Sequence, residues 1–114
     1  MLAKANRVRL KRDFERVFAS PRSLQCRFFR LKAVLTESEV TRFGIVTSAK
    51  VSKKAVARNR LRRRLRSILA TELPALPVGY DIVIFCQPAA ATAGFAELRA
   101  EVAGAFGRLF SRTR

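Results

Sequence analysis

Histidine is absent from this chain of 114 residues, and only 8 of its side chains are acidic. Histidine is the commonest general base in enzymes, and a two-metal nuclease needs clustered carboxylates. The acids are instead scattered, and none lies between residues 50 and 66, where basic residues are densest. The sequence therefore predicts that the protein has no catalytic site of its own and no metal site.

Cysteines and long apolar runs are also scarce. The two cysteines, Cys26 and Cys86, each lie inside an apolar run, and without any histidine they do not make a zinc site. We expect two buried, reduced thiols without a disulfide partner. No stretch approaches the ~20 apolar residues of a membrane span, and the N-terminus has charge but no apolar segment typical of a secretory signal. A cytoplasmic protein without a membrane partner is expected.

What the chain has in excess is arginine. Its 18 Arg and 6 Lys against 8 acids give a formal charge of +16. Such a charge attracts polyanions, either nucleic acid or an anionic membrane surface. Arginine binds phosphate through two parallel N–H groups and stacks on bases better than lysine does, which favours nucleic acid. The length fits one domain over residues 1–114, and 49% apolar residues with nine Phe are enough for a core.

The first half of the chain predicts an arm, a helix and a sheet. Residues 1–10 are basic and aperiodic, so we expect a loosely ordered N-terminal arm. Apolar residues at i, i+3 and i+4 predict a helix over 13–19, which ends at Ser20-Pro21. Strand-forming residues predict strands over 26–35 and 42–47, joined by a polar hairpin loop over 36–41.

The second half predicts a long helix over 54–73, ended by prolines and a glycine in 74–79. Residues 80–86 are apolar enough for a central strand that is covered on both faces. A last helix is expected over 93–110, with one apolar stripe formed by Phe95, Leu98, Val102, Phe106 and Leu109. One α+β domain follows from this order.

The long helix carries the most informative pattern. Residues 50–66 hold nine basic side chains and no acid. At 100° per residue, Ala57, Leu61, Leu65, Ile68 and Leu69 share a stripe that faces the core. A ridge of Arg58, Arg62 and Arg66 lies beside that stripe, and Asn59 and Arg63 form the next ridge. A charged face is usually solvated and laced with ion pairs, but this face has no acidic partner before Glu72. An external polyanion is the better interpretation.

Two further features are compatible with RNA binding. The amide of Asn59 can donate to and accept from a base edge or a sugar, although an ordinary surface role is the alternative. Phe14 and Phe18 lie one turn apart among basic residues, as in a stacking platform for single strands. Phenylalanines at this spacing are more often core residues, and they could serve both purposes.

Two runs of the sequence are similar to a known family. They are Arg42-Phe-Gly-Ile-Val-Thr-Ser-Ala-Lys50 and Lys54-Ala-Val-Ala-Arg-Asn-Arg-Leu-Arg-Arg-Arg-Leu-Arg66. Together they resemble the signature of the bacterial ribonuclease P protein subunit, whose core is Arg58-Asn59-Arg60 with the arginines that follow. The likeness extends to the family's first helix at residues 10–18 and its last strand at residues 79–88.

The resemblance implies a ribosomal-protein-like fold of order α-β-β-β-α-β-α. Its central, mostly antiparallel sheet is packed by helices, with a left-handed crossover around the arginine-rich helix. It also implies a function within the ribonuclease P endoribonuclease holoenzyme. There, a catalytic RNA with Mg²⁺ removes the 5′ leader of precursor tRNA, and the protein binds both RNAs.

The resemblance also implies two sets of site residues. The expected contacts with the catalytic RNA are Lys50, Lys53, Lys54, Arg58, Asn59, Arg60, Arg62, Arg63 and Arg66. The expected cleft for the precursor-tRNA leader comprises Arg12, Phe14, Phe18, Lys32, Val46, Ser48, Arg58 and Asn59. Lys32 stands where the family often has an aromatic residue, so a phosphate contact replaces stacking in this hypothesis.

Two other functions fit parts of the pattern. A general or ribosomal RNA-binding protein explains the charge, but it explains neither the asparagine among the arginines nor the aromatic helix. A cationic membrane-surface protein is disfavoured, because the long helix uses its apolar stripe for the core.

Overall fold

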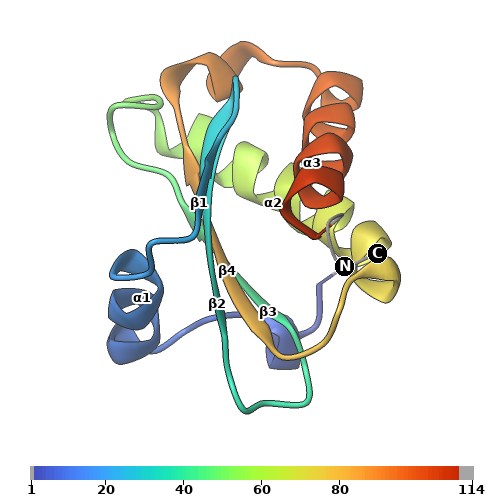
Figure 1. The fold of residues 1–114 in the computed structure, drawn as a ribbon. Helices are drawn as coiled ribbons and strands as arrows, with labels where there is room; N and C mark the ends of the chain where they lie inside the picture. The colour runs from blue at the N-terminus through green and yellow to red at the C-terminus, as the bar shows by residue number, and fades with distance from the viewer. Residues whose placement is uncertain (1, 111–114) are drawn as a thin grey trace.

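The computed structural model describes residues 2–110, in which a four-stranded sheet separates one short helix from two longer ones (Figure 1). The order α-β-β-β-α-β-α is confirmed, with three short 3₁₀ turns, η1 (Lys4–Asn6), η2 (Leu73–Ala75) and η3 (Pro88–Thr92), between the main elements. The elements are α1 (Lys11–Phe18), β1 (Ser23–Gln25), β2 (Phe29–Leu35), β3 (Arg42–Val46), α2 (Ala55–Glu72), β4 (Tyr80–Cys86) and α3 (Phe95–Phe110).

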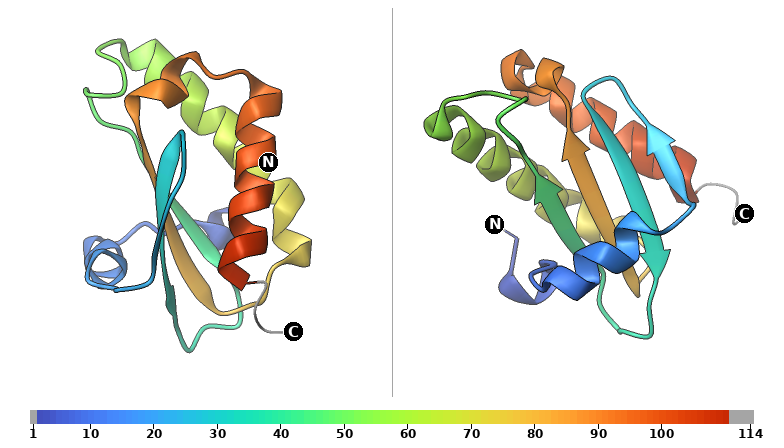
Figure 2. Two further views of the ribbon diagram at one scale, coloured as in Figure 1. Left: turned by 45° about the horizontal axis from the view of Figure 1, so that its top comes forward. Right: turned by 90° about the vertical axis from the view of Figure 1, so that its left-hand side faces the viewer.

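The sheet has the strand order β1-β2-β4-β3 and is mostly antiparallel. Only β3 and β4 run parallel, with Gly44 opposite Val83 and Val46 opposite Phe85. Seen with α1 in front (Figure 2, right), both strands run upward, β4 lies to the right of β3, and α2 passes behind the sheet. This β3–α2–β4 crossover is therefore left-handed, against the strong preference for right-handed connections.

The predicted hairpin between 26–35 and 42–47 is wrong. Strand β4 lies between β2 and β3, so the loop over 36–41 does not join paired strands. The loop is held instead by the segment before β4, since Thr36 N–H donates to Gly79 O at 2.7 Å and Thr41 Oγ1 donates to Pro77 O at 2.7 Å. The hairpin in this region is β1–β2, in which Leu24 faces Leu31. The composition of a polar loop does not show whether the two strands that it connects are paired with each other or are separated in the sheet by a third strand.

The main core lies between the sheet and the pair α2 and α3 (Figure 1). The predicted stripe of α2 is confirmed from Leu61 onwards, because Leu61, Leu65, Ile68 and Leu69 are all buried, whereas Ala57 in the first turn is only half-buried. On α3 the predicted stripe is buried from Leu98 onwards, whereas Phe95 keeps 42% of its surface exposed. Phe95 is the first residue of α3 and lies beyond the end of the core.

The N-terminal segment, expected to be loosely ordered, is packed along the outer edge of β3. Arg7 forms a parallel bridge with Phe43, and Val8 N–H donates to Phe43 O at 2.8 Å. Leu2 and Val8 are buried, with 2% and 6% of their surfaces exposed. Only alanines and polar residues separate these two residues, so no repeated apolar spacing marked them in the sequence.

Candidate RNA-binding face and cleft

The inner arginines of α2 are fixed by the loop that precedes the helix. Arg58 Nη1 donates to Ser52 O at 2.7 Å, and Arg62 Nη1 donates to Thr47 Oγ1 at 2.8 Å. A guanidinium group has five N–H donors, so each bond uses only a part of its capacity. Both side chains are half-buried and are held in place beside the end of β3.

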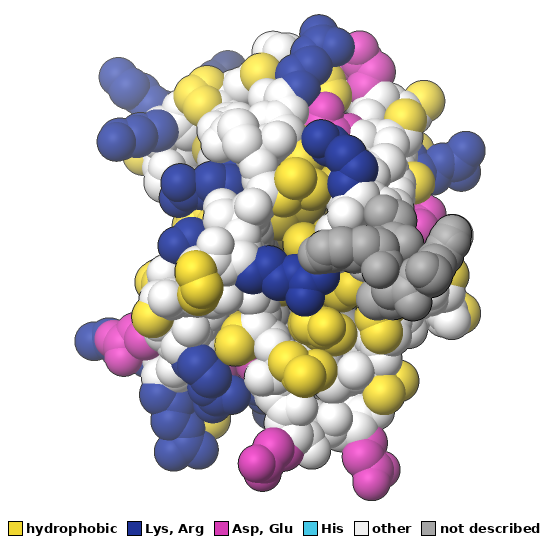
Figure 3. Space-filling model, in the orientation of Figure 1, with side chains coloured by type: hydrophobic (Ala, Val, Ile, Leu, Met, Phe, Trp, Pro, Cys, Tyr) yellow, Lys and Arg dark blue, Asp and Glu magenta, His cyan; other side chains and the backbone are white. Residues whose placement is uncertain are grey.

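The outer side of α2 carries the exposed members of the basic segment. Asn59, Arg60 and Arg63 are exposed, and Lys50, Lys53 and Lys54 are exposed in the loop before the helix. Among residues 2–110 the ion pairs are Arg16–Asp13, Arg42–Asp13 and Arg42–Asp81, and none involves this segment. Basic side chains gather over the loop before α2 at the upper left of Figure 3. The positive charge of α2 is thus compensated by no acid in the described part of the chain.

An ion-pair chain docks α1 on the other face of the sheet. Asp81 on β4 is fully buried and receives Arg42 Nε at 2.9 Å and Arg42 Nη2 at 2.6 Å. Arg42 Nη2 also lies 3.3 Å from Asp13 Oδ2 of α1. The hydrogen bonds to Asp81 raise the pKa of Arg42 above its ordinary value, so this guanidinium stays charged. The chain Asp13–Arg42–Asp81 sets where the aromatic residues of α1 lie.

The aromatic residues of α1 form a continuous row with residues of the sheet. The ring centroids of Phe14 and Phe18 are 6.1 Å apart, and those of Phe18 and Phe85 are 5.2 Å apart. The Arg30 guanidinium lies over the Phe85 ring, 5.3 Å from its centroid. Phe18 keeps 42% of its surface exposed although it packs on Phe85. The result is a row of three rings and one guanidinium that is partly open to solvent, an arrangement suited to stacking bases.

Gly44 allows α1 to lie this close to the sheet. A Cβ atom at Gly44 would lie 2.6 Å from Cε1 and 2.9 Å from Cζ of Phe14. Real Cβ atoms do not approach other atoms so closely, so any larger residue would displace the Phe14 ring. The Phe14 ring occupies the space that a side chain at position 44 would need, so this position of β3 accommodates only glycine unless the ring moves.

The comparisons with known proteins agree with this geometry. The model of the Ribonuclease P family matches residues 2–110. The chain belongs to this family. It is 39% identical over 112 residues to the ribonuclease P protein component of Acidothermus cellulolyticus, which covers 96% of this chain and 92% of that protein. It is 34% identical over 118 residues to the corresponding protein of a Cyanothece strain, with 90% of each chain covered.

The solved ribonuclease P proteins share the fold. The protein from Thermotoga maritima superimposes with a TM-score of 0.80 at 30% identity, over 90% of this chain and 96% of that chain. The protein from Staphylococcus aureus superimposes with a TM-score of 0.80 at 24% identity, over 89% and 92% of the two chains, and shows the likeness of fold alone.

In this family member, the residues predicted for the leader cleft do not all lie on one face of the sheet. Phe14 and Phe18 lie over the sheet surface below α1, whereas Arg58 and Asn59 belong to α2 on the opposite face. The remaining predicted residues are Arg12, exposed on α1; Ser48, exposed after β3; and Lys32 and Val46, half-buried on β2 and β3.

Lys32 has a partner in the structure. Its Nζ donates to Phe18 O, at the end of α1, at 2.7 Å. A cation at a helix C-terminus is favoured by the helix dipole. This bond uses one of three N–H donors, so Lys32 fastens α1 and still presents charge beside Phe18.

Sequence reasoning missed two residues of this row, Phe85 and Arg30. They are register partners on β4 and β2. Alternation along β4 was the available signal, because the fully buried Asp81 faces α1 and residues two and four positions later share that side. The sequence interpretation treated this strand as apolar on both faces and therefore did not assign Phe85 to the face that carries α1.

The family member carries two cysteine thiols, both free. Burial raises the pKa of Cys86 to about 12 although the positive charge of Arg62 lowers it, and burial also raises the pKa of Cys26. Both thiols are neutral at physiological pH and poorly nucleophilic. In the described part of the chain, no three His, Cys, Asp or Glu side chains group so that they could hold a metal ion. No helix within residues 2–110 is long and apolar enough to cross a membrane.

Proposed function

We propose that this ribonuclease P protein binds the catalytic RNA through α2 and its preceding loop, and the 5′ leader of precursor tRNA through the aromatic row below α1. The holoenzyme then removes the leader to give the mature tRNA 5′ end. The observation that carries the proposal is the segment from residue 50 to 66, whose nine basic side chains have no acidic partner among the described residues.

The contribution of the protein in this proposal is electrostatic and positional. Two RNAs that meet at one active site repel each other through their phosphates, and a rigid bank of guanidinium groups between them reduces that repulsion. The affinity should therefore fall steeply with salt, with a log–log slope of about −0.7 to −0.9 for each phosphate neutralised. The aromatic row adds stacking of unpaired leader bases, worth about 1–3 kcal/mol per base.

Magnesium belongs to the RNA in this proposal. The carboxylates of residues 2–110 do not group into a site for a metal ion, and Asp13 and Asp81 are already engaged by Arg42. The residues present do not fit a catalytic Mg²⁺ centre, so no step of the reaction is assigned to them.

The test is cleavage of precursor tRNA by a bacterial ribonuclease P RNA at limiting Mg²⁺, with and without this protein. We expect the protein to restore cleavage at the mature 5′ end, and more strongly for a substrate with a leader. If the folded protein binds RNA but gives no stimulation, and if its affinities for ribosomal RNA, precursor tRNA and duplex DNA are equal, a general RNA-binding role replaces the proposal. Cleavage by the protein alone would contradict the assignment of catalysis to the RNA.

A further inference from the structure

Acidic side chains are scarce in this chain, yet two of the eight contact a single guanidinium group. Among residues 2–110, Arg42 is the one basic residue that lies within ion-pair distance of two carboxylates, those of Asp13 and Asp81. The charge of Arg42 is therefore more than balanced by its own neighbours. Such a residue is poorly suited to bind an RNA phosphate and well suited to hold two elements of the protein together.

The two carboxylates belong to elements that differ in how firmly they are placed. Asp81 is fully buried on β4, which pairs with a strand on each side. Helix α1 has only eight residues and no side-chain hydrogen bond at its N-cap, and an isolated helix of this length is not stable in water. The position of α1 therefore depends on its contacts with the sheet. Arg42 Nη2 supplies one of them, because it lies 2.6 Å from Asp81 Oδ2 and 3.3 Å from Asp13 Oδ2.

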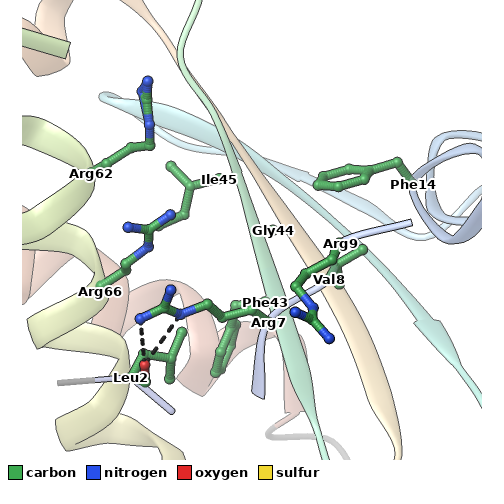
Figure 4. A pocket seen from close by; sticks show the side chains of 10 residues that line it. All are labelled: Leu2, Arg7, Val8, Arg9, Phe14, Phe43, Gly44, Ile45, Arg62 and Arg66. Carbon is green, nitrogen blue, oxygen red and sulfur yellow. Dashed lines mark hydrogen bonds between the residues drawn. The ribbon is translucent and has the colours of Figure 1, made fainter. Parts of the chain in front are cut away.

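Phe14 follows Asp13 directly in α1, so a contact that holds Asp13 also restricts this ring. In Figure 4 the ring extends from α1 toward β3 at Gly44. It is part of the lining of a pocket of about 270 Å³, which Arg7 and Arg66 line from the N-terminal segment and α2. Phe14 is only half-buried, and part of its surface remains accessible. A shift of α1 at Asp13 would move this accessible surface.

We propose that Arg42 is a positioning residue for recognition of the precursor-tRNA leader. Through Asp13 it holds Phe14 where the ring can stack on a leader base, and Arg42 itself does not contact the RNA. Lys32 serves the opposite end of the helix, where its Nζ donates to Phe18 O at 2.7 Å. The identity of the ligand rests on the proposed function, whereas the placement of Phe14 by the Arg42–Asp13 contact does not.

The first experiment follows the Phe14 ring by NMR in the full chain. A Cβ atom at Gly44 would lie 2.6 Å from this ring, so the ring current of Phe14 should shift the α protons of Gly44. Asp13→Ala removes the contact with Arg42, and the Gly44 resonances should move toward their random-coil positions. Glu15→Ala removes an exposed acid from the same helix and should leave them in place. Unchanged Gly44 resonances in Asp13→Ala would show that the contact does not place the ring, and would overturn the proposal.

The second experiment measures binding to the holoenzyme formed with a bacterial ribonuclease P RNA. The ratio of the affinities for precursor tRNA and for mature tRNA without a leader isolates the contribution of the leader. Asp13→Ala should lower this ratio about fivefold, because stacking of one base on an aromatic side chain contributes at least about that factor. Asp13→Asn, which keeps one acceptor oxygen, should give a smaller loss. The matched control Glu15→Ala should change the ratio less than twofold.

The sign of the effect separates positioning from net charge. Asp13→Ala and Glu15→Ala each raise the net charge by one, so general attraction to phosphates should strengthen RNA binding in both variants. A gain or no change in the ratio of Asp13→Ala would therefore contradict the proposal. Equal losses of affinity for the two substrates, measured well below the Tm of each variant, would assign Asp13 to the fold alone and would also contradict it.

Failure of the proposed function gives a different result. If the unaltered chain binds precursor and mature tRNA equally, the leader contact itself is refuted, and with it the role of Arg42 in recognition. The Gly44 resonances would then still report whether the Arg42–Asp13 contact places Phe14. If the unaltered chain prefers the precursor and Asp13→Ala keeps that preference, the leader contact stands and the positioning role of Arg42 is refuted.

Discussion

Replacement of Asp81 by asparagine tests whether the ion-pair chain holds α1 on the sheet. Asp81 is fully buried and receives two hydrogen bonds from Arg42, whose side chain is 25% exposed. Removal of one partner from a buried pair costs about 3–5 kcal/mol. Arg42 keeps contact with water and with Asp13, so we expect the lower end, about 3 kcal/mol. For a domain of this size, that loss lowers Tm by about 12 °C.

The assay is thermal and urea unfolding followed by circular dichroism, with Arg16→Gln as the control. Arg16 pairs with the buried Asp13, but the Arg16 side chain is itself 48% exposed and Asp13 keeps Arg42 as a partner, so the loss of Arg16 should cost less than about 1 kcal/mol. The double variant Arg42→Met/Asp81→Asn should regain part of the stability lost in Asp81→Asn, since no buried charge is left unpaired. If Asp81→Asn and Arg16→Gln differ by less than about 1 kcal/mol, the ion-pair chain does not dock α1.

The remaining predictions concern RNA contacts and the half-buried thiol of Cys86. Arg63→Glu should weaken binding to the catalytic RNA without a change in Tm, measured by filter binding beside Arg99→Glu; unchanged binding would refute the assigned face. Lys32→Ala should lower the part of the affinity for precursor tRNA that depends on the leader, and no loss relative to the unaltered chain would dismiss the phosphate contact. Cys86 should resist alkylation at pH 8 in the native state, because its pKa is about 12. Its neutral thiol should contribute stability below pH ~9, the unfolded pKa, that is lost as the pH rises towards 12; an alkaline unfolding profile that Cys86→Ala leaves unchanged would contradict this.

Periodicity predicted the parts of the fold whose burial repeats along the chain. The stripe of Leu61, Leu65 and Ile68 placed α2 against the core, and the apolar run over 80–86 placed β4 at the centre of the sheet. Strand partners carry no such period. The polar loop over 36–41 fits a hairpin as well as it fits two strands that a third one later separates, so the order β1-β2-β4-β3 came only from the structure.

The candidate site shows the same division. The arginines of α2 were found because they cluster in one segment, and their lack of acidic partners could be read from the sequence. Arg7 and Phe85 were missed because their neighbours in space are more than 50 residues away in the sequence. Arg7 and Arg66 line the same pocket, and the rings of Phe85 and Phe18 are in contact. A site assembled by tertiary contact gives no local signal when its members are single residues.

The position of β4 in both the sheet and the chain has a consequence for biosynthesis. β4 is the only strand that pairs with both β2 and β3 among the described residues, yet it is synthesised after α2. While a ribosome makes the chain from its N-terminus, the β1–β2 hairpin can close early, but β3 must wait for residues 80–86 before its parallel partner exists. A nascent chain that stops before Tyr80 is therefore highly positively charged and incompletely folded, because α2 has no complete sheet to pack against. The sheet is complete only when residue 86 has been made, and the core is complete only when α3 has followed it.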